Sequence, residues 1–143
     1  MQRLWTALVL AAAVINLAPV LGAVSAERMS AFYGVDLGHA NLRIVMQHRA
    51  VLFGIVGGVL LRAAFHPPLR TLGYVVGFTS MLSFLFIAGL VGGYSAEIQR
   101  IVLIDVAGVV ALAAAGAIDA LWLRSARAWA PLASFPKTPG THG

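Results

Sequence analysis

The sequence predicts an all-α membrane protein, a four-transmembrane-helix bundle with a short interfacial helix between helices 1 and 2. The chain of 143 residues is 60% hydrophobic and only 10% charged, which is far from the balance of a soluble domain. Its mean hydropathy is +0.89. Four apolar stretches, residues 4–23, 45–65, 71–93 and 101–123, each approach the ~20 residues that a helix needs to cross the hydrocarbon of a bilayer.

The first stretch, residues 4–23, has two interpretations. Arg3, the apolar run and the small residues at 24–26 (VSA) also fit a secretory signal peptide. The run is longer than the roughly 7–15 apolar residues of such a signal, and it contains Asn16 and Pro19. A retained transmembrane helix is therefore favoured over a cleaved signal.

The long connection over residues 24–44 contains its own structural signals. Residues 25–33 (SAERMSAFY) predict a short helix that stops at Gly34. The side chains expected to lie on the membrane surface are those of Met29, Phe32 and Tyr33. A turn is expected at residues 36–38, and Asn41 is expected to cap a second helix that begins before the bilayer proper.

Short connections join the other helices. Two prolines within residues 66–70 stop the second helix, because proline cannot continue it. Residues 94–100 form the other link, after the glycines at 92–93 that end the third helix. Short links predict antiparallel neighbours. The transmembrane domain is expected to cover residues 1–127, and residues 128–143 to form a disordered cytoplasmic tail.

The charges are more informative about topology than about binding partners. The net charge is +5, and the basic groups are spread singly, which argues against a nucleic-acid-binding face. With the N-terminus inside, the inner set is Arg3, Arg62, Arg70, Arg124, Arg127 and Lys137, and the outer set is Arg28, Arg43, Arg49 and Arg100 beside Glu27, Asp36 and Glu97. This excess of inner basic residues favours a multi-pass membrane protein with both termini cytoplasmic and the lipid bilayer as its partner.

Two acidic residues lie within the fourth apolar stretch, where a charge costs roughly 2.5–3.5 kcal/mol and usually faces a protein interior or a water path. Asp105 and Arg49 each lie about one turn inside the same end of their helices, so the two can pair. The candidate intramembrane polar cluster around them also includes Glu97, Arg43, His48 and Arg100. A pair that only orders the helices is favoured, and a binding or proton-handling site is the alternative.

The second carboxylate, Asp119, lies about 40° around the helix from Asp105 and ~21 Å along it. The strip between the two is formed by Gly108, Leu112 and Gly116. This face is either a path between two carboxylates or a close-packing surface of small residues. The second interpretation is favoured, with Asp119 reaching the inner surface near Arg62 or Arg124.

Other polar and small residues suggest packing rather than catalysis. The candidate pocket-lining residues are Asn16, Thr79, Ser80 and Ser83, which either bond to their own helix backbones or form a polar pocket with Arg49 and Asp105. Small-residue pairs four positions apart, Gly54/Gly58, Gly73/Gly77 and Gly89/Gly93, allow helices to approach closely within a chain or between chains, and so permit a homo-oligomer without indicating one.

No catalytic, cofactor-binding or metal-ligating set is recognisable. The chain has no cysteine, so it offers neither a thiolate nucleophile nor a thiolate ligand. Its four histidines, His39, His48, His66 and His142, are never three or four positions apart, and a zinc site usually needs three or four protein ligands.

Several stretches resemble small bacterial four-helix membrane proteins of the DoxX-like group, whose function is unknown. They are FYGV at 32–35, RIVMQHRAVLFG at 43–54, and residues 80–94 followed by Ile104-Asp105. The resemblance covers most of residues 1–124 and implies a four-helix inner-membrane bundle without an established substrate.

Some of these similar sequences are automatically labelled phosphopantetheine adenylyltransferase. That soluble family uses an HxGH motif on an α/β sheet. This chain offers only Gly38-His39 without the first histidine, and it has no alternating strand and helix pattern. The adenylyltransferase activity is therefore not expected.

Three functions remain open on the sequence. The favoured one is a non-enzymatic structural or accessory bundle. The first alternative is a small transporter or proton-handling component, with Asp105 as the ion-binding carboxylate and Asp119 at the other mouth. The second is a membrane enzyme whose outer pocket of Arg43, His48 and Arg49 holds an anionic headgroup.

Overall fold

A computed structural model describes the backbone of residues 1–129 and the side chains of residues 1–124. In chain order the elements are α1 (Gln2–Leu17), η1 (Ala18–Gly22), α2 (Ala26–Tyr33), α3 (Ala40–Phe65), η2 (Pro67–Leu69), α4 (Arg70–Val91) and α5 (Ala96–Trp129). No strand occurs in residues 1–129, so the predicted all-α fold is confirmed.

Four helical segments are long and apolar enough to cross a membrane. They are Gln2–Gly22, Ala40–Phe65, Pro67–Val91 and Ala96–Arg124, with mean hydropathies of 2.1, 1.7, 2.0 and 2.5. Each contains most of one predicted stretch, and the short helix α2 follows the first of them. The chain therefore folds as a multi-pass membrane protein.

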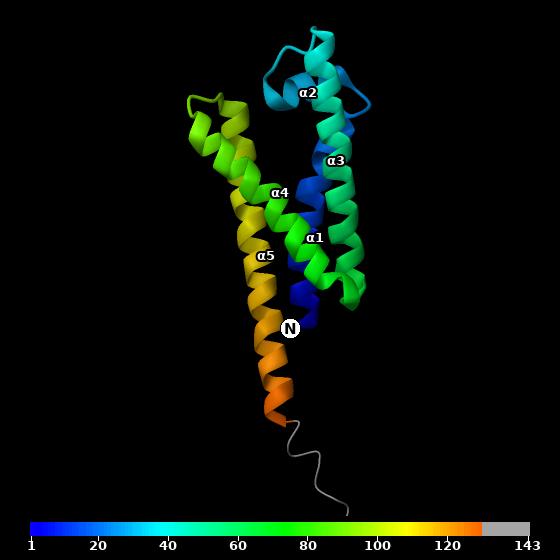
Figure 1. Cartoon of the computed structure of the whole chain (residues 1–143), viewed down its shortest axis with the longest axis vertical. Coiled ribbons are helices and arrows are strands. Elements are labelled where there is room, and N and C mark those ends of the chain that lie inside the picture. The colour runs from blue at the N-terminus through cyan, green and yellow to red at the C-terminus, as the bar shows by residue number, and fades with distance from the viewer. Residues whose placement is uncertain (130–143) are drawn as a thin grey trace, which may run out of the picture.

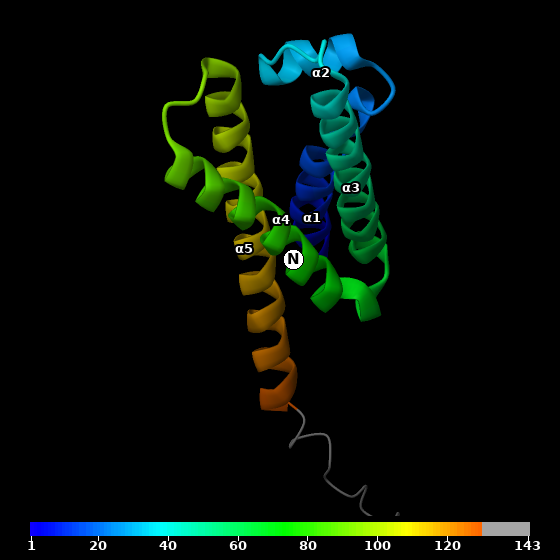
Figure 2. The same cartoon turned by 45° about the horizontal axis from the view of Figure 1, so that its top comes forward.

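The four long helices pack in a ring in which α1 contacts α3 and α5, and α4 contacts the same two helices. Figures 1 and 2 both show α4 beside α3 at the end where η2 joins them, and both show the two helices parting toward α2. These are called below the η2 end and the α2 end of the bundle. The bundle is closely packed at the first and splayed at the second.

The main core lies toward the η2 end and along α1. Its buried residues are Trp5, Val9, Ala12, Ala13, Leu60, Ala64, Met81, Leu112 and Ala115. Glycines on α4 let its backbone approach the neighbours here: a Cβ at Gly73 would lie 2.8 Å from the Ala63 Cβ, and one at Gly77 would lie 2.7 Å from Leu112. Small residues thus determine where α4 packs tightly.

The short helix α2 begins and ends at the residues that the sequence indicates. The Ser25 hydroxyl accepts a hydrogen bond from the Arg28 amide at 3.3 Å, and Gly34 ends the helix at a φ of 64°. Its expected surface position is only partly correct. Phe32 is 43% exposed, but Met29 and Tyr33 are buried, because α2 packs back on α3 and α5 and forms a second small core there.

The cap of the second long helix and the start of the tail differ from the expectation, whereas the turn between α2 and α3 agrees with it. The second long helix begins at Ala40 with His39 at its N-cap and without a side-chain cap, so Asn41 lies inside the helix. The turn at 36–38 forms as expected, with the Gly38 amide donating to Asp36 Oδ1 at 2.9 Å. The expected tail begins at residue 128 within α5, and its part beyond Trp129 lies outside the described residues.

Candidate functional site

The η2 end carries a hydrogen-bonded cluster that joins three helices. Trp5 comes from α1, Arg70 and Tyr74 from α4, and Asp119 from α5. Arg70 and Tyr74 are four residues apart, so they lie on one face of α4 and point to the same neighbours. These four residues are called below the η2-end cluster.

Every member of the η2-end cluster contacts another. Arg70 Nη1 lies 2.7 Å from Asp119 Oδ1, and the Tyr74 hydroxyl donates to Asp119 Oδ2 at 2.8 Å. The Trp5 indole N–H donates to the Tyr74 hydroxyl at 2.7 Å, and the Arg70 guanidinium lies over the Trp5 ring, 3.9 Å from its centroid. Both carboxylate oxygens of Asp119 are therefore bound by side chains of α4.

The partners of Asp119 differ from those that the sequence suggested. Arg62 and Arg124 are exposed, and neither pairs with it; its partner is Arg70, at the first turn of α4. Arg70 and Asp119 are only 24% and 17% exposed, so the pair is largely buried. The only sequence signal for this pairing is that short links make α4 and α5 antiparallel, which brings the start of α4 to the level of residue 119.

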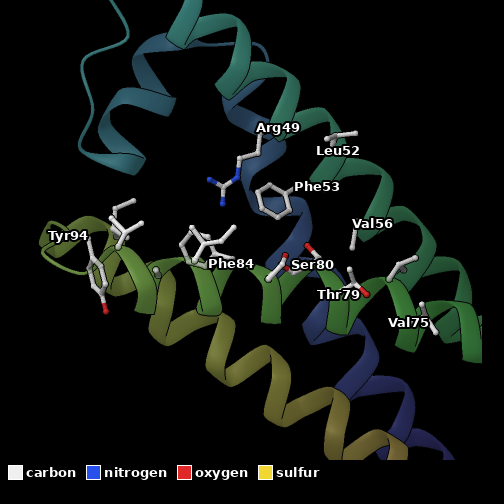
Figure 3. A pocket seen from close by; sticks show the side chains of 15 residues that line it. Arg49, Leu52, Phe53, Val56, Val75, Thr79, Ser80, Phe84 and Tyr94 are labelled. Carbon is white, nitrogen blue, oxygen red and sulfur yellow. The ribbon is translucent and has the colours of Figure 1, made fainter.

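The α2 end contains a groove of about 710 Å³ between α3 and α4, closed at one end by the start of α5. Figure 3 shows its two walls, with Arg49 and Phe53 on α3 facing Phe84 and Ser80 on α4. The remaining lining residues are Leu52, Val56, Val75, Val76, Thr79, Ser83, Ile87, Ala88, Val91, Tyr94 and Ile98. This space is called below the α3–α4 groove.

The Arg49 guanidinium lies among aromatic rings in the α3–α4 groove. Its Cζ is 5.0 Å from the centroid of Phe53, 5.1 Å from that of Phe84 and 5.8 Å from that of Tyr33. These distances are within the range of cation–π attraction. Within residues 1–124 no carboxylate lies within 4.0 Å of this guanidinium, so the direct ion pair with Asp105 is not formed.

Asp105 is nevertheless close to Arg49. Its side chain is 9% exposed, and in the part of the chain that the structure describes it makes no hydrogen bond or ion pair. Burial raises the pKa of the Tyr33 phenol; the Arg49 charge opposes that shift and the Asp105 charge adds to it. Tyr33 therefore lies near both charged groups, and the three form a loose set at the α2 end.

The other residues of the expected polar cluster do not line the α3–α4 groove. The Arg43 guanidinium donates to the Leu37 carbonyl at 3.2 Å, and His48 and Arg100 are exposed. Glu97 lies against Gly34, where a Cβ would be 2.8 Å from its carboxylate. Of the three residues expected to form an outer pocket, only Arg49 lines the α3–α4 groove; Arg43 and His48 do not.

Most of the expected pocket-lining residues do line this groove. Thr79, Ser80 and Ser83 lie along it with Arg49. Asn16 lies behind the wall, where its Oδ1 accepts a hydrogen bond from the Ser80 hydroxyl at 3.1 Å and its Nδ2 donates to the Ala12 carbonyl at 3.0 Å. The aromatic residues Phe53, Phe84 and Tyr94 were not expected there, since lipid-facing and groove-facing aromatics look alike in sequence.

No group of three or more histidine, cysteine, aspartate or glutamate residues close enough to hold a metal ion occurs among the described residues. Comparison with protein-family models, with curated proteins and with solved structures gives no match to this chain. Function is therefore inferred from the residues of the two polar regions themselves.

Proposed function

We propose that this chain is a non-enzymatic accessory protein of the membrane, whose intramembrane charges hold a small helix bundle in shape. The observation that supports this role best is the state of Asp119. Both of its carboxylate oxygens are occupied by Arg70 and Tyr74 at 2.7 and 2.8 Å. A carboxylate held in this way ties α4 to α5, with each of its two oxygens bound by a side chain of α4.

A double-mutant cycle on Arg70→Gln and Asp119→Asn tests this role. Each single change leaves a partly buried partner unpaired, so we expect each to lower the free energy of unfolding by about 2 kcal/mol. Once one partner of the ion pair is lost, replacing the other costs less, so we expect a coupling energy of about 1 kcal/mol between the two changes. Unfolding would be followed by circular dichroism during titration of micelles with sodium dodecyl sulfate.

The exposed Arg62→Gln is the matched control and should change stability by less than about 0.5 kcal/mol. If both single variants were as stable as the wild type, the cluster would not be structural. If Asp119→Asn stayed folded but abolished a proton or solute flux in proteoliposomes, the accessory role would be wrong.

A second candidate, a proton-handling or transport component, is favoured by one observation. Asp105 is buried and lacks a hydrogen-bond or ion-pair partner among the described residues. Reconstituted protein carrying Asp105→Asn would separate the two functions. Loss of a flux measured with a pH-sensitive dye, with an unchanged unfolding curve, would support transport, whereas equal fluxes in both proteins would argue against it.

The proposed location is the bacterial inner membrane with both termini in the cytoplasm, in keeping with the DoxX-like resemblance and the charge bias. Because the chain has no cysteine, single cysteines can be placed freely. With a membrane-impermeant maleimide applied to intact spheroplasts, Ser95→Cys should be labelled and His66→Cys should not. The reverse pattern would mean the opposite orientation.

A homo-oligomer is proposed through the small-residue faces that remain uncovered. Gly58 and Gly89 have no atom within 4 Å of a Cβ position, whereas Gly73 and Gly77 are already used inside the bundle. Cross-linking in native membranes should therefore yield a dimer that Gly89→Leu weakens and Val110→Leu, on an exposed position of α5, does not.

A further inference from the structure

We propose that the α3–α4 groove binds a long-chain carboxylate amphiphile, which enters sideways from the bilayer and places its acid group at Arg49. This inference goes beyond the accessory role, because it assigns a ligand to a region that the η2-end cluster does not involve. It depends on the shape of the groove, on the state of the Arg49 charge and on the depth of that charge in the membrane.

The groove has the size and the lining of a ligand site. Its volume of about 710 Å³ falls within the range of roughly 300–1,000 Å³ that is usual for small-molecule sites. Its walls are mainly aliphatic and aromatic, with a few polar groups. It lies where α4 parts from α3 in Figures 1 and 2, within segments that span the membrane. The molecules next to such an opening are lipid chains, so an apolar chain is the natural occupant.

Arg49 supplies the positive charge in this apolar surrounding. The rings of Tyr33, Phe53 and Phe84 contact it, but aromatic rings do not neutralise a charge, and no carboxylate lies within 4.0 Å in residues 1–124. A guanidinium presents a planar fork of N–H donors that matches a carboxylate with two parallel hydrogen bonds. The Asp105 charge lies near Arg49 but does not bind it: within residues 1–124 the guanidinium makes no hydrogen bond or ion pair, so its N–H donors stay open to the acid group of a ligand.

The depth of Arg49 favours a carboxylate over a phospholipid headgroup. From Phe65, the last residue of α3, to Arg49 the helix rises ~24 Å, while the hydrocarbon layer is ~30 Å thick. With Phe65 at one boundary, the Arg49 backbone lies roughly one turn inside the other. The acid group of a single-chain amphiphile can reach this level, whereas a phosphate belongs to the headgroup layer above it.

The serines below Arg49 are compatible with a plain hydrocarbon chain. The Ser80 hydroxyl donates to Asn16 Oδ1 at 3.1 Å, and the Ser83 hydroxyl donates to the Ser80 carbonyl at 3.0 Å. Both hydroxyl hydrogens are therefore used within the protein and require no acceptor on the ligand. Beyond them the groove is lined by Val56 and Val75, which would contact the chain.

Equilibrium binding of radiolabelled palmitic acid to the full chain in phosphatidylcholine nanodiscs tests the proposal. We expect saturable binding that Arg49→Gln weakens by about tenfold or more, because a charge-assisted, two-pronged contact is lost. Arg49→Lys keeps the charge without the planar fork, so its affinity for palmitic acid should lie between those of the wild type and Arg49→Gln. The exposed Arg62→Gln should bind as the wild type does.

A second pair of variants tests the groove without touching the charge. Val75→Trp fills the groove and should weaken binding, whereas Val110→Trp, at a 62% exposed position of α5, should not. Unfolding curves of all variants would be measured alongside, so that only folded proteins are compared. Equal binding by the wild type, Arg49→Gln and Val75→Trp would overturn the proposal.

Competitors identify the ligand class. Unlabelled palmitic acid should displace the probe, while hexadecanol, which lacks the charge, should displace it at least about tenfold more weakly. Phosphatidylglycerol that competed as well as palmitic acid would overturn the choice of a carboxylate. Because the η2-end cluster is not part of the groove, failure of this experiment leaves the Arg70–Asp119 cycle intact, and failure of that cycle leaves this one intact.

Discussion

At the η2 end of the bundle the Arg70 guanidinium stacks on Trp5 and binds Asp119, whereas at the α2 end the Arg49 guanidinium lies among aromatic rings with no carboxylate within 4.0 Å. Both ends use an arginine, aromatic residues and an aspartate of α5. The difference is that the ion pair is closed at one end and open at the other.

The position of α4 explains this difference. At the η2 end, Gly73 lets α4 pack against α3 so closely that a Cβ there would lie 2.8 Å from Ala63. At the α2 end, Phe53 of α3 and Phe84 of α4 line opposite walls of the α3–α4 groove, which takes the place of a helix contact. The same kinds of residue thus form an ion pair that joins α4 to α5 at the η2 end, where the helices are in contact. At the α2 end, where α3 and α4 part, they form a candidate binding site.

The largest effect is expected from Trp5→Ala. Trp5 is 2% exposed and stabilises the η2 end by packing, by its hydrogen bond to Tyr74 and by stacking on Arg70. We expect the free energy of unfolding to fall by about 3 kcal/mol, measured by titration with sodium dodecyl sulfate. Leu4→Ala, at a 58% exposed position of the same helix, is the control and should cost far less. Equal effects would show that neither the burial of Trp5 nor its contacts in the η2-end cluster stabilise the bundle.

A glycine pair on α4 compares a position packed against α3 at the η2 end with a position that has no neighbour in the bundle. Gly73→Ala forces a methyl group against the Ala63 Cβ, which cannot rotate away, so we expect a loss of about 2 kcal/mol. Gly89→Ala meets open space and should leave the stability unchanged or raise it by less than about 1 kcal/mol. A similar loss in both variants would mean that the loss does not come from the close packing of Gly73 against Ala63.

The sequence was sufficient for the elements but not for their contacts. Hydropathy predicts the four spans, and Ser25 with Gly34 marks α2, because these signals are local. The pairing of Asp119 with Arg70 depends on how α4 and α5 are rotated against each other, which a uniformly apolar helix does not encode in its periodicity. For the same reason the rings around Arg49, which come from α2, α3 and α4, could not be predicted.

Packing also bears on the first apolar stretch. α1 contributes Trp5, Val9, Ala12 and Ala13 to the main core. Removal of this segment would open the core along α3 and α5, and its retention stays a prediction from the sequence.

Tyr74→Phe is expected to have a moderate effect. It removes the hydroxyl that accepts from Trp5 and donates to Asp119, so one buried N–H and one carboxylate oxygen lose a partner. We expect a loss of about 1.5 kcal/mol in the unfolding titration. Tyr94→Phe, at a 41% exposed position by the α3–α4 groove, should change stability by less than about 0.5 kcal/mol. A larger loss of stability for Tyr94→Phe would mean that hydrogen bonds also stabilise the α2 end.

The smallest effect on the free energy of unfolding is expected from Arg49→Gln. This variant is to be compared with Arg70→Gln, which removes the arginine at the η2 end. Loss of Arg70 leaves Asp119 without its ion pair, at a cost of about 2 kcal/mol. Loss of Arg49 removes contacts with rings but breaks no ion pair, so we expect the free energy of unfolding to fall by about 1 kcal/mol or less. If Arg49→Gln lowered the free energy of unfolding as much as Arg70→Gln does, Arg49 would be a structural residue coupled to Asp105. A small cost would instead mean that the bundle keeps a charge in its apolar groove without needing it to fold, as expected of a group that serves to bind a ligand.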